Sequence, residues 1–127
     1  MNSRQEIERL LRELYDARAA GDLNGVCRTF TDNARFEIAG ASQSNPIAIS
    51  ATGIAQIRTW LAILIKTFQI TDQEVVSMII EDAKAAVHWR AKIRSRITGA
   101  AVPTDLVDLA EIRDGRIASY TEFFVPR

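Results

Sequence analysis

The sequence predicts an α+β domain in which helices from the first half pack on an antiparallel sheet from the second half. Three observations support this. Apolar residues recur at helical spacing in residues 6–21 and again in residues 54–68. From Thr71 onward every second residue is apolar instead, which is typical of strands. Because helices precede a run of strands, we expect an antiparallel meander, with a hollow under the helices that suits a small molecule.

The first third of the chain is expected to form two helices and a strand. Gly21 is suited to end the first helix, and Asp22 is suited to cap the second. The second helix carries a short apolar stripe, formed by Val26, Cys27 and Phe30. Residues 31–33, Thr-Asp-Asn, predict a turn. A strand is expected to begin near Arg35.

Residues 40–51 are rich in Gly, Ser, Asn and Ala and contain Pro46, so they are expected to form a loop across the mouth or edge of the fold. Thr52 is then the expected cap of a third helix, with Trp60 on the flank of its apolar face. The four strands that follow are expected at residues 75–80, 85–97, 106–112 and 116–124.

Length and composition indicate one domain, residues 1–127, of a soluble globular protein. Apolar residues make up 47% of the chain and charged residues 25%. Sixteen basic residues balance 16 acidic ones, so the bulk charge gives no support to nucleic-acid binding.

Two further observations bear on location. No apolar run is long enough to span a membrane, and the charged residues from Arg4 onward exclude a secretory signal peptide. The one cysteine, Cys27, cannot form an internal disulfide, which fits a reducing compartment. A cytoplasmic protein is therefore expected.

The strand at residues 85–97 separates two faces. Its apolar face holds Val87, Trp89, Ala91 and Ile93, and its polar face holds His88, Arg90, Lys92, Arg94 and Arg96. One interpretation of the polar face is a polyanion-binding surface. The other, which we favour because no aromatic stacking platform accompanies it, is a solvated face paired with Asp105 and Glu111 of the next strand. On that interpretation His88 lies at the surface or in a subunit interface.

Two carboxylates in the last two strands are the main candidates for chemistry. If residues 113–115 form a three-residue hairpin loop, Asp108 lies opposite Tyr120, and Glu122 lies diagonally across on the same face. A two-residue turn at 114–115 would reverse the parity and separate the carboxylates. The apolar pattern of the strands favours the three-residue loop.

On a concave, mostly apolar face, desolvation raises the pKa of a carboxyl group. Asp108 is then predicted to act as the acid or oxyanion donor, Glu122 as the base or water activator and Tyr120 as a supporting donor. The alternative is that each carboxylate caps a buried polar group or binds an arginine such as Arg35 or Arg116.

The sequence contains no zinc spacing, phosphate-binding glycine loop, dinucleotide fingerprint or GxSxG elbow, so neither a metal nor a cofactor is expected. Seven residues complete the predicted site as ligand-binding candidates: Tyr15, Ile38, Trp60, Trp89, Ala91, Leu106 and Phe124.

Several short segments resemble a known family. They are residues 19–23 (AAGDL), 30–34 (FTDNA), 114–117 (DGRI) and 120–124 (YTEFF). Together they resemble the SnoaL-like and ketosteroid-isomerase-like group of the nuclear transport factor 2-like superfamily. The resemblance implies a cystatin-like, cone-shaped barrel of a strongly bent antiparallel sheet wrapped by three N-terminal helices around an apolar pocket, commonly in a homodimer. It also implies isomerases, polyketide cyclases, dehydratases or epoxide hydrolases alongside non-catalytic binding proteins.

The resemblance carries over only in part to individual residues. Asp108 matches the protonated oxyanion-hole aspartate of ketosteroid isomerases, but their tyrosine and base positions hold Leu14 and Ile38. Glu122 resembles a catalytic carboxylate of the limonene-epoxide-hydrolase-like members. The arginine and aspartate positions of those members correspond to Trp89 and Ala91, and the histidine position of the dehydratases falls at Lys66 and Thr67.

The sequence therefore predicts a homodimeric protein, paired through its sheet face, that binds a small, largely apolar ligand or substrate in the cone. As an enzyme it would be a cofactor-free isomerase, cyclase or hydratase. The alternative is a non-catalytic ligand-binding or dimerisation module of the same fold.

Overall fold

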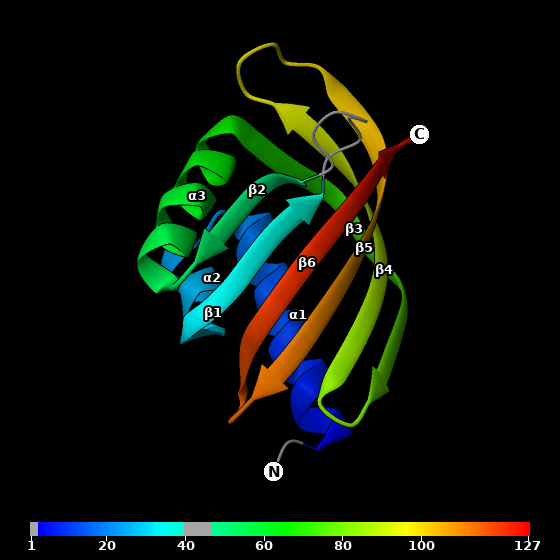
Figure 1. Ribbon diagram of the computed structural model, residues 1–127. Helices are drawn as coiled ribbons and strands as arrows, with labels where there is room; N and C mark the ends of the chain where they lie inside the picture. Colours follow the sequence, from blue (N-terminus) through cyan, green and yellow to red (C-terminus); the bar gives the residue numbers. More distant parts are fainter. Residues whose placement is uncertain (1–2, 40–46) are drawn as a thin grey trace.

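A computed structural model describes residues 3–39 and 47–127, with three helices that cover one face of a strongly curved sheet (Figure 1). The helices are α1 (Arg4–Ala20), α2 (Leu23–Arg28) and α3 (Ile54–Thr67). The strands are β1 (Phe30–Ala39), β2 (Ile47–Thr52), β3 (Phe68–Glu81), β4 (Lys84–Ser95), β5 (Ala101–Arg113) and β6 (Arg116–Pro126). The sheet order is β2-β1-β6-β5-β4-β3 and does not close on itself, so the fold is an open α+β cone.

The expected meander is present in β3 to β6, where each strand pairs antiparallel with the next. β1 joins this meander by pairing parallel with β6 and antiparallel with β2. β6 is thus a central strand, and α1 lies behind the sheet (Figure 1). This arrangement places Glu122, the candidate carboxylate of β6, next to α1.

The helix boundaries at the first break agree with the sequence prediction. Gly21 adopts φ 70° after α1, a left-handed conformation that costs glycine little. Asp22 caps α2 by accepting a hydrogen bond of 3.0 Å from the backbone N–H of Gly25. At the start of α1, Ser3 and Glu6 form a capping box.

The start of the first strand was predicted wrongly. β1 begins at Phe30 rather than near Arg35, and it includes residues 31–33, which the sequence predicted as a turn. The turn-forming residues interrupt regular pairing, because the register between β1 and β6 shifts between Phe30 and Arg35. Pairing with β6 at Phe30 and again from Arg35 holds this locally unfavourable sequence in the strand.

The expected loop at residues 40–51 is also corrected in part. Residues 47–52 form β2 at the edge of the sheet, whereas residues 40–46 lie outside the described part of the chain. Thr52 does not cap α3. Gly53 occupies the N-cap position with φ 87°, and the backbone N–H of Thr52 donates to Oε1 of Gln56 at 2.9 Å.

The hairpin between β5 and β6 combines both of the geometries considered from the sequence. The turn is the two-residue type, with Asp114 at φ 52° and Gly115 at φ 79°. A bulge at Ala118 then adds one residue to β6, because Ile112 pairs with Ile117 but Glu111 with Ser119. The bulge restores the parity that the short turn would have reversed.

The two faces of β4 are as predicted up to its end at Ser95, which leaves Arg96 outside the strand. Val87, Trp89 and Ala91 are buried against the helices. On the outer face, Asp105 of β5 lies between two side chains of β4, with its Oδ1 3.1 Å from Arg90 Nε and its Oδ2 3.6 Å from His88 Nε2. The outer face is therefore paired with acidic residues of the neighbouring strand. Within the described residues, no helix is long and apolar enough to cross a membrane.

Candidate functional site

The inner face of the sheet brings together the two predicted carboxylates. Asp108 of β5 and Glu122 of β6 are direct cross-strand partners, and they are 1% and 3% exposed. The bulge in β6 makes them opposite rather than diagonal, so Tyr120 faces Ala110 instead of Asp108. Because residues on one face of an antiparallel pair touch, the two carboxylates act electrostatically on each other.

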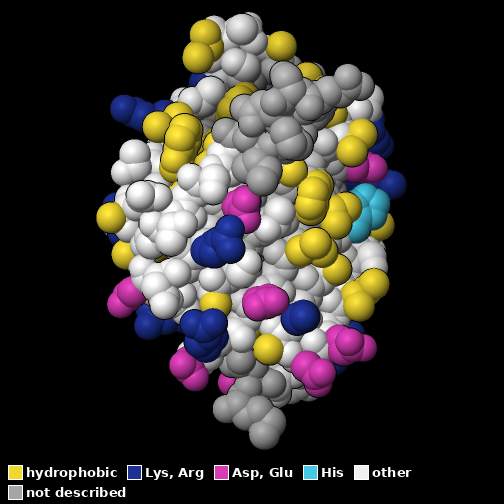
Figure 2. Space-filling model, in the orientation of Figure 1, with side chains coloured by type: hydrophobic (Ala, Val, Ile, Leu, Met, Phe, Trp, Pro, Cys, Tyr) yellow, Lys and Arg dark blue, Asp and Glu magenta, His cyan; other side chains and the backbone are white. Residues whose placement is uncertain are grey.

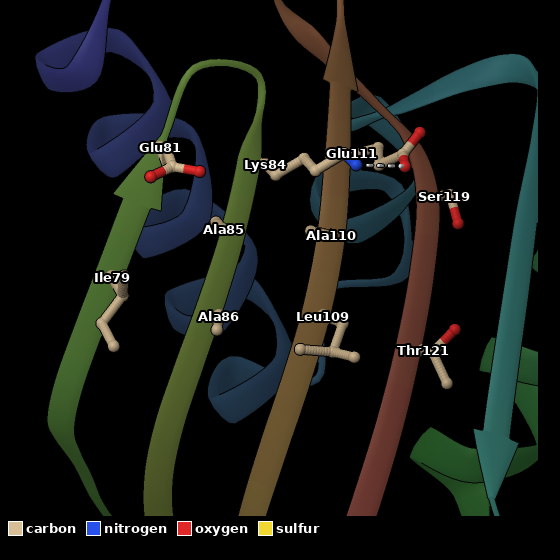
Figure 3. A pocket seen from close by; sticks show the side chains of 10 residues that line it. All are labelled: Ile79, Glu81, Lys84, Ala85, Ala86, Leu109, Ala110, Glu111, Ser119 and Thr121. Carbon is tan, nitrogen blue, oxygen red and sulfur yellow. Dashed lines mark ion pairs between the residues drawn. The ribbon is translucent and has the colours of Figure 1, made fainter.

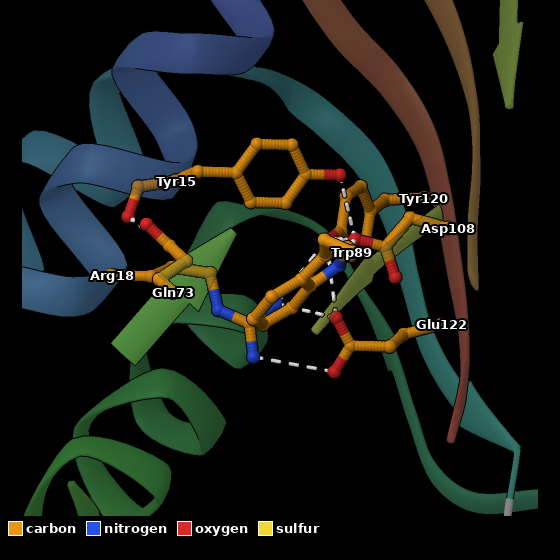
Figure 4. Close-up of polar contacts among 7 residues, drawn as sticks. All are labelled: Tyr15, Arg18, Gln73, Trp89, Asp108, Tyr120 and Glu122. Atoms are coloured by element: carbon orange, nitrogen blue, oxygen red, sulfur yellow. Dashed lines mark hydrogen bonds and ion pairs between the residues drawn. The ribbon is translucent and has the colours of Figure 1, made fainter. Parts of the chain in front are cut away.

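Three donors converge on a single oxygen of Asp108 (Figure 4). The hydroxyl of Tyr15 and the indole N–H of Trp89 each lie 2.7 Å from Oδ2, and the hydroxyl of Tyr120 donates to the same oxygen. Tyr15 projects from α1, whose backbone is tied to β3 by a 3.3 Å hydrogen bond from Gln73 Nε2 to the Tyr15 carbonyl. Among the described residues, nothing partners the buried Oδ1 of Asp108.

Glu122 forms a two-pronged ion pair with Arg18 of α1. Nη1 of Arg18 lies 2.5 Å from Oε2 of Glu122, and Nη2 lies 3.2 Å from Oε1. The guanidinium also donates to the Tyr120 hydroxyl at 3.2 Å and lies 5.3 Å from the centre of the Trp89 ring. Arg18 and Tyr15 are three residues apart, which places both on one face of α1.

The Tyr120 hydroxyl joins the two halves of this cluster. It lies next to Oδ2 of Asp108 and 3.2 Å from Oε2 of Glu122. We define the polar cluster as these six residues, contributed by α1, β4, β5 and β6: Tyr15, Arg18, Trp89, Asp108, Tyr120 and Glu122.

The carboxylates of the polar cluster have opposite pKa shifts. Burial and the neighbouring Glu122 carboxylate raise the pKa of Asp108 well above its usual range. Burial alone would raise the pKa of Glu122 as well, but the Arg18 guanidinium outweighs it and lowers that pKa. The raised pKa favours the protonated form of Asp108, and the lowered pKa favours the ionised form of Glu122, whose charge Arg18 balances.

The two phenols of the cluster remain donors. Burial and the Asp108 carboxyl raise the pKa of both Tyr15 and Tyr120 above the ordinary value, so neither loses its proton at neutral pH. Burial lowers the pKa of Arg18, but the Glu122 charge more than compensates, and Arg18 stays charged.

A cavity of about 500 Å³ opens beside the polar cluster, between the helices and the inner face of the sheet. Its volume lies in the range of roughly 300–1,000 Å³ that holds small-molecule ligands. Arg18 and Glu122 line it, but the other four members of the polar cluster are not among its lining residues. The ion pair is therefore the part of the cluster that a bound molecule would meet.

The predicted ligand-binding residues fall into three groups. Ile38, Leu106 and Phe124 line the cavity. Tyr15 and Trp89 hold Asp108 in the polar cluster instead, with Tyr15 fully buried rather than at a rim. The remaining two, Ala91 and Trp60, are not among the lining residues; Ala91 is buried in the core, and Trp60 is 36% exposed on α3.

Arg18 is the site residue that the sequence interpretation missed. It occupies the helical phase of Leu11 and Leu14, on the apolar face of α1, and a charged residue in that phase signals a buried partner. The expectation that an arginine binds a carboxylate is correct for Glu122, but the arginine is neither Arg35 nor Arg116. Arg35 lies 3.5 Å from Glu37 in an exposed pair.

A second hollow of about 350 Å³ lies on the outer face of the sheet (Figure 3). It forms where the small side chains of Ala86, Ser119 and Thr121 leave space next to Leu109. Lys84 and Glu111 lie at its edge as an exposed ion pair of 3.9 Å. This hollow is more open than the inner cavity and holds no buried polar side chain to fix a ligand.

The described residues contain no group of three His, Cys, Asp or Glu side chains arranged to hold a metal ion. What the site does contain is two buried carboxyl groups, Asp108 with a raised pKa and Glu122 with a lowered one, joined by the Tyr120 hydroxyl. Such a hydrogen-bonded arrangement can bind a polar group and can also move a proton.

The chain thus forms an open α+β cone with a largely apolar cavity and two buried carboxylates on its inner face. The family model for the SnoaL-like domain matches residues 11–120, and the chain belongs to that family. No curated protein matches the sequence.

Solved structures share the fold. A proposed isomerase from Bacillus subtilis has a TM-score of 0.86 at 20% identity, covering 98% of this chain and 90% of that one. An epoxide hydrolase of the LEH-like type from M. tuberculosis has a TM-score of 0.77 at 16% identity, covering 95% and 84%. A proposed SnoaL-like polyketide cyclase from Mesorhizobium loti has a TM-score of 0.70 at 15% identity, covering 91% and 97%. At these identities the similarity establishes the nuclear transport factor 2-like fold alone.

Proposed function

We propose that the protein binds a small, largely apolar molecule in the inner cavity, with a polar group of that molecule at the Arg18–Glu122 ion pair. The observation that carries this proposal is the ion pair itself, which lies in the wall of an otherwise apolar cavity. Apolar surface supplies most of the binding free energy, and a few convergent polar groups fix orientation.

The binding proposal is tested by filling the cavity. Leu106 of β5 lines the cavity, whereas Val76 of β3 is 42% exposed and lines neither hollow. The neutral dye N-phenyl-1-naphthylamine should fluoresce on binding the native protein and the Val76→Trp control. Leu106→Trp should weaken binding at least about tenfold, since the new indole occupies ligand space. Equal binding by both variants would place the dye elsewhere and refute the proposal.

Catalysis is a second candidate, favoured by the hydrogen-bonded chain from Glu122 through Tyr120 to Asp108. Glu122 would take a proton from the ligand or activate water. Asp108 would stay protonated and hold the Tyr120 hydroxyl beside Glu122, and the proton that Glu122 takes up would return from Glu122 to another atom of the ligand or to water. The structural neighbours described as an isomerase, a cyclase and an epoxide hydrolase suggest isomerisation, cyclisation or hydration as the reactions to screen.

Substitution of Asp108 by Ala should abolish turnover of any substrate found in such a screen. Tyr120→Phe should lower it strongly while keeping the aromatic packing, because the link between the carboxyls is lost. Unchanged turnover by Asp108→Ala would rule out this assignment. Ligand binding without turnover, insensitive to Tyr120→Phe, would instead support the non-catalytic binding module.

We further propose a homodimer that forms through the outer face of the sheet. Hydrophobic side chains gather on this face (Figure 2). Those of β5 and β6 are 40–62% exposed: Val107, Leu109, Phe123 and Val125. Contiguous exposed apolar side chains are typical of an interface, and a twofold contact pairs such a face with itself.

Sedimentation velocity tests the dimer. Phe123→Lys should give a monomer, whereas Ile63→Lys on α3, a position of similar exposure, should leave the dimer intact. A native protein that sediments as a monomer at all concentrations would refute this proposal.

We also propose that residues 1–127 form one domain and that the protein is cytoplasmic, in keeping with its single buried cysteine, Cys27. Limited proteolysis tests the single domain and should release no stable fragment. Cell fractionation tests the cytoplasmic location.

A further inference from the structure

The Arg18–Glu122 ion pair bears on the charge of the ligand. Both residues line the inner cavity, and their side chains are only 11% and 3% exposed. Two hydrogen bonds, of 2.5 and 3.2 Å, join them, so each charge is neutralised by the other. The pair offers the cavity one donor group and one acceptor group, and no net charge.

Among the described residues, the other polar side chains of the cavity wall are two hydroxyls, and both bond within their own segment. Ser95 Oγ accepts 3.2 Å hydrogen bonds from the backbone N–H groups of Ile97 and Thr98. Thr104 Oγ1 donates to the carbonyl of Val102 at 3.0 Å. The remaining described lining residues are apolar, among them Ile38, Leu61, Leu106 and Phe124.

We propose that this ion pair makes the cavity selective for uncharged ligands, namely a hydrocarbon body bearing a hydroxyl or carbonyl group. This inference rests on the proposed binding function. A carboxylate that approached Arg18 would meet the charge of Glu122, and an ammonium group near Glu122 would meet that of Arg18. Either ion would be buried without a counter-charge, which is strongly unfavourable. A neutral hydroxyl can donate to Glu122, and a carbonyl can accept from Arg18.

Three naphthalenes with the same hydrocarbon body test the selectivity by isothermal titration calorimetry at neutral pH. They are 2-naphthalenemethanol, 2-naphthoate and 2-naphthylmethylammonium. The native protein should bind the alcohol at least about tenfold more tightly than either ion. Comparable binding of one of the ions would overturn the inference and leave the binding function intact. Binding of none of the three would overturn the binding function together with the inference.

Substitutions in the pair should reverse the preference. Glu122→Gln leaves the guanidinium of Arg18 without its counter-charge, so naphthoate should become the preferred probe. Arg18→Met leaves Glu122 uncompensated, so the ammonium probe should be preferred instead. An alcohol preference that persists in both folded variants would show that the pair does not set selectivity.

A buried unpaired charge destabilises a fold, so a second test avoids one. The double variant Arg18→Met/Glu122→Gln has no uncompensated charge. The native protein should prefer 2-naphthalenemethanol to 2-methylnaphthalene, because the ion pair hydrogen-bonds to the hydroxyl. The double variant should lose most of that preference while still binding 2-methylnaphthalene. An undiminished preference for the alcohol would overturn the inference.

Discussion

Replacement of Asp108 by Asn should remove a pH dependence of stability that the native protein shows. Asp108 has a raised pKa in the folded state because it is buried beside the Glu122 carboxylate. Its stabilising contribution is fully present below the unfolded-state pKa, near 3.9, and is lost as the pH rises through the folded-state pKa. Glu122 has a lowered pKa, so its contribution is present above about pH 4.5 and is lost only in acid.

Asp108 and Glu122 contribute to the pH dependence of stability in different pH ranges, so the size of the Asp108 contribution can be worked out separately. Above about pH 5, Glu122 is ionised in both states and contributes no slope. Asp108 then holds one proton in the folded state and none in the unfolded state. The free energy of unfolding should therefore fall by up to about 1.4 kcal/mol per pH unit until the folded-state pKa of Asp108 is reached.

Urea unfolding from pH 5 to pH 8 measures this slope. Asp108→Asn cannot titrate, so its slope over the same range should be close to zero. Glu111→Gln is the matched control, since Glu111 is an exposed carboxylate on the same strand, and it should keep the native slope. A native protein whose stability is constant or rises over this range would refute the reasoning. Asp108 would then be ionised, held by its three hydrogen-bond donors.

Three further substitutions test the packing of the site and of the fold. Arg18→Met should lower the free energy of unfolding by about 3–5 kcal/mol by leaving Glu122 buried and unpaired, and a second substitution, Glu122→Gln, should restore part of the loss. Both are measured by urea unfolding, and a loss that the second substitution deepens would count against the ion pair. Trp89→Phe keeps an aromatic ring but removes a donor to Asp108, so we expect a loss of about 1–3 kcal/mol. A thermal melt unchanged by this substitution would argue against that hydrogen bond. Gly21→Ala forces a side chain into the left-handed region after α1 and should cost about 1–2 kcal/mol in the same assay, whereas an increase in stability would contradict the cap.

The sequence by itself determined the local features, because these depend on neighbouring residues. The capped break at Gly21 and Asp22 and the alternation of β4 follow from backbone preference and from the burial of one face. The shared face of Asp108 and Glu122 was also predicted. The predicted face is correct, but the predicted three-residue hairpin loop is wrong. The turn has two residues, and a bulge at Ala118 compensates for the shorter turn.

The elements that depend on distant pairing were not predictable in the same way. β2 has a composition typical of a loop, and β1 begins within turn-forming residues, yet both pair along the sheet. A strand needs a partner for its backbone hydrogen bonds, and no local pattern names that partner. The cap of α3 was misplaced by one residue, because Thr52 and Gly53 are both residue types found at N-caps.

The candidate site shows most clearly which features follow from local sequence and which depend on distant parts of the chain. The sequence identified Asp108, Tyr120 and Glu122 from strand parity alone. Only the tertiary structure selected Arg18 as the partner of Glu122, across 104 residues of sequence, and turned Tyr15 inward to Asp108. Which cation reaches a buried carboxylate depends on how α1 crosses the sheet, and packing of side chains from distant segments decides that crossing. The tertiary structure thereby separated the residues that line the cavity from those that hold the carboxylates behind it.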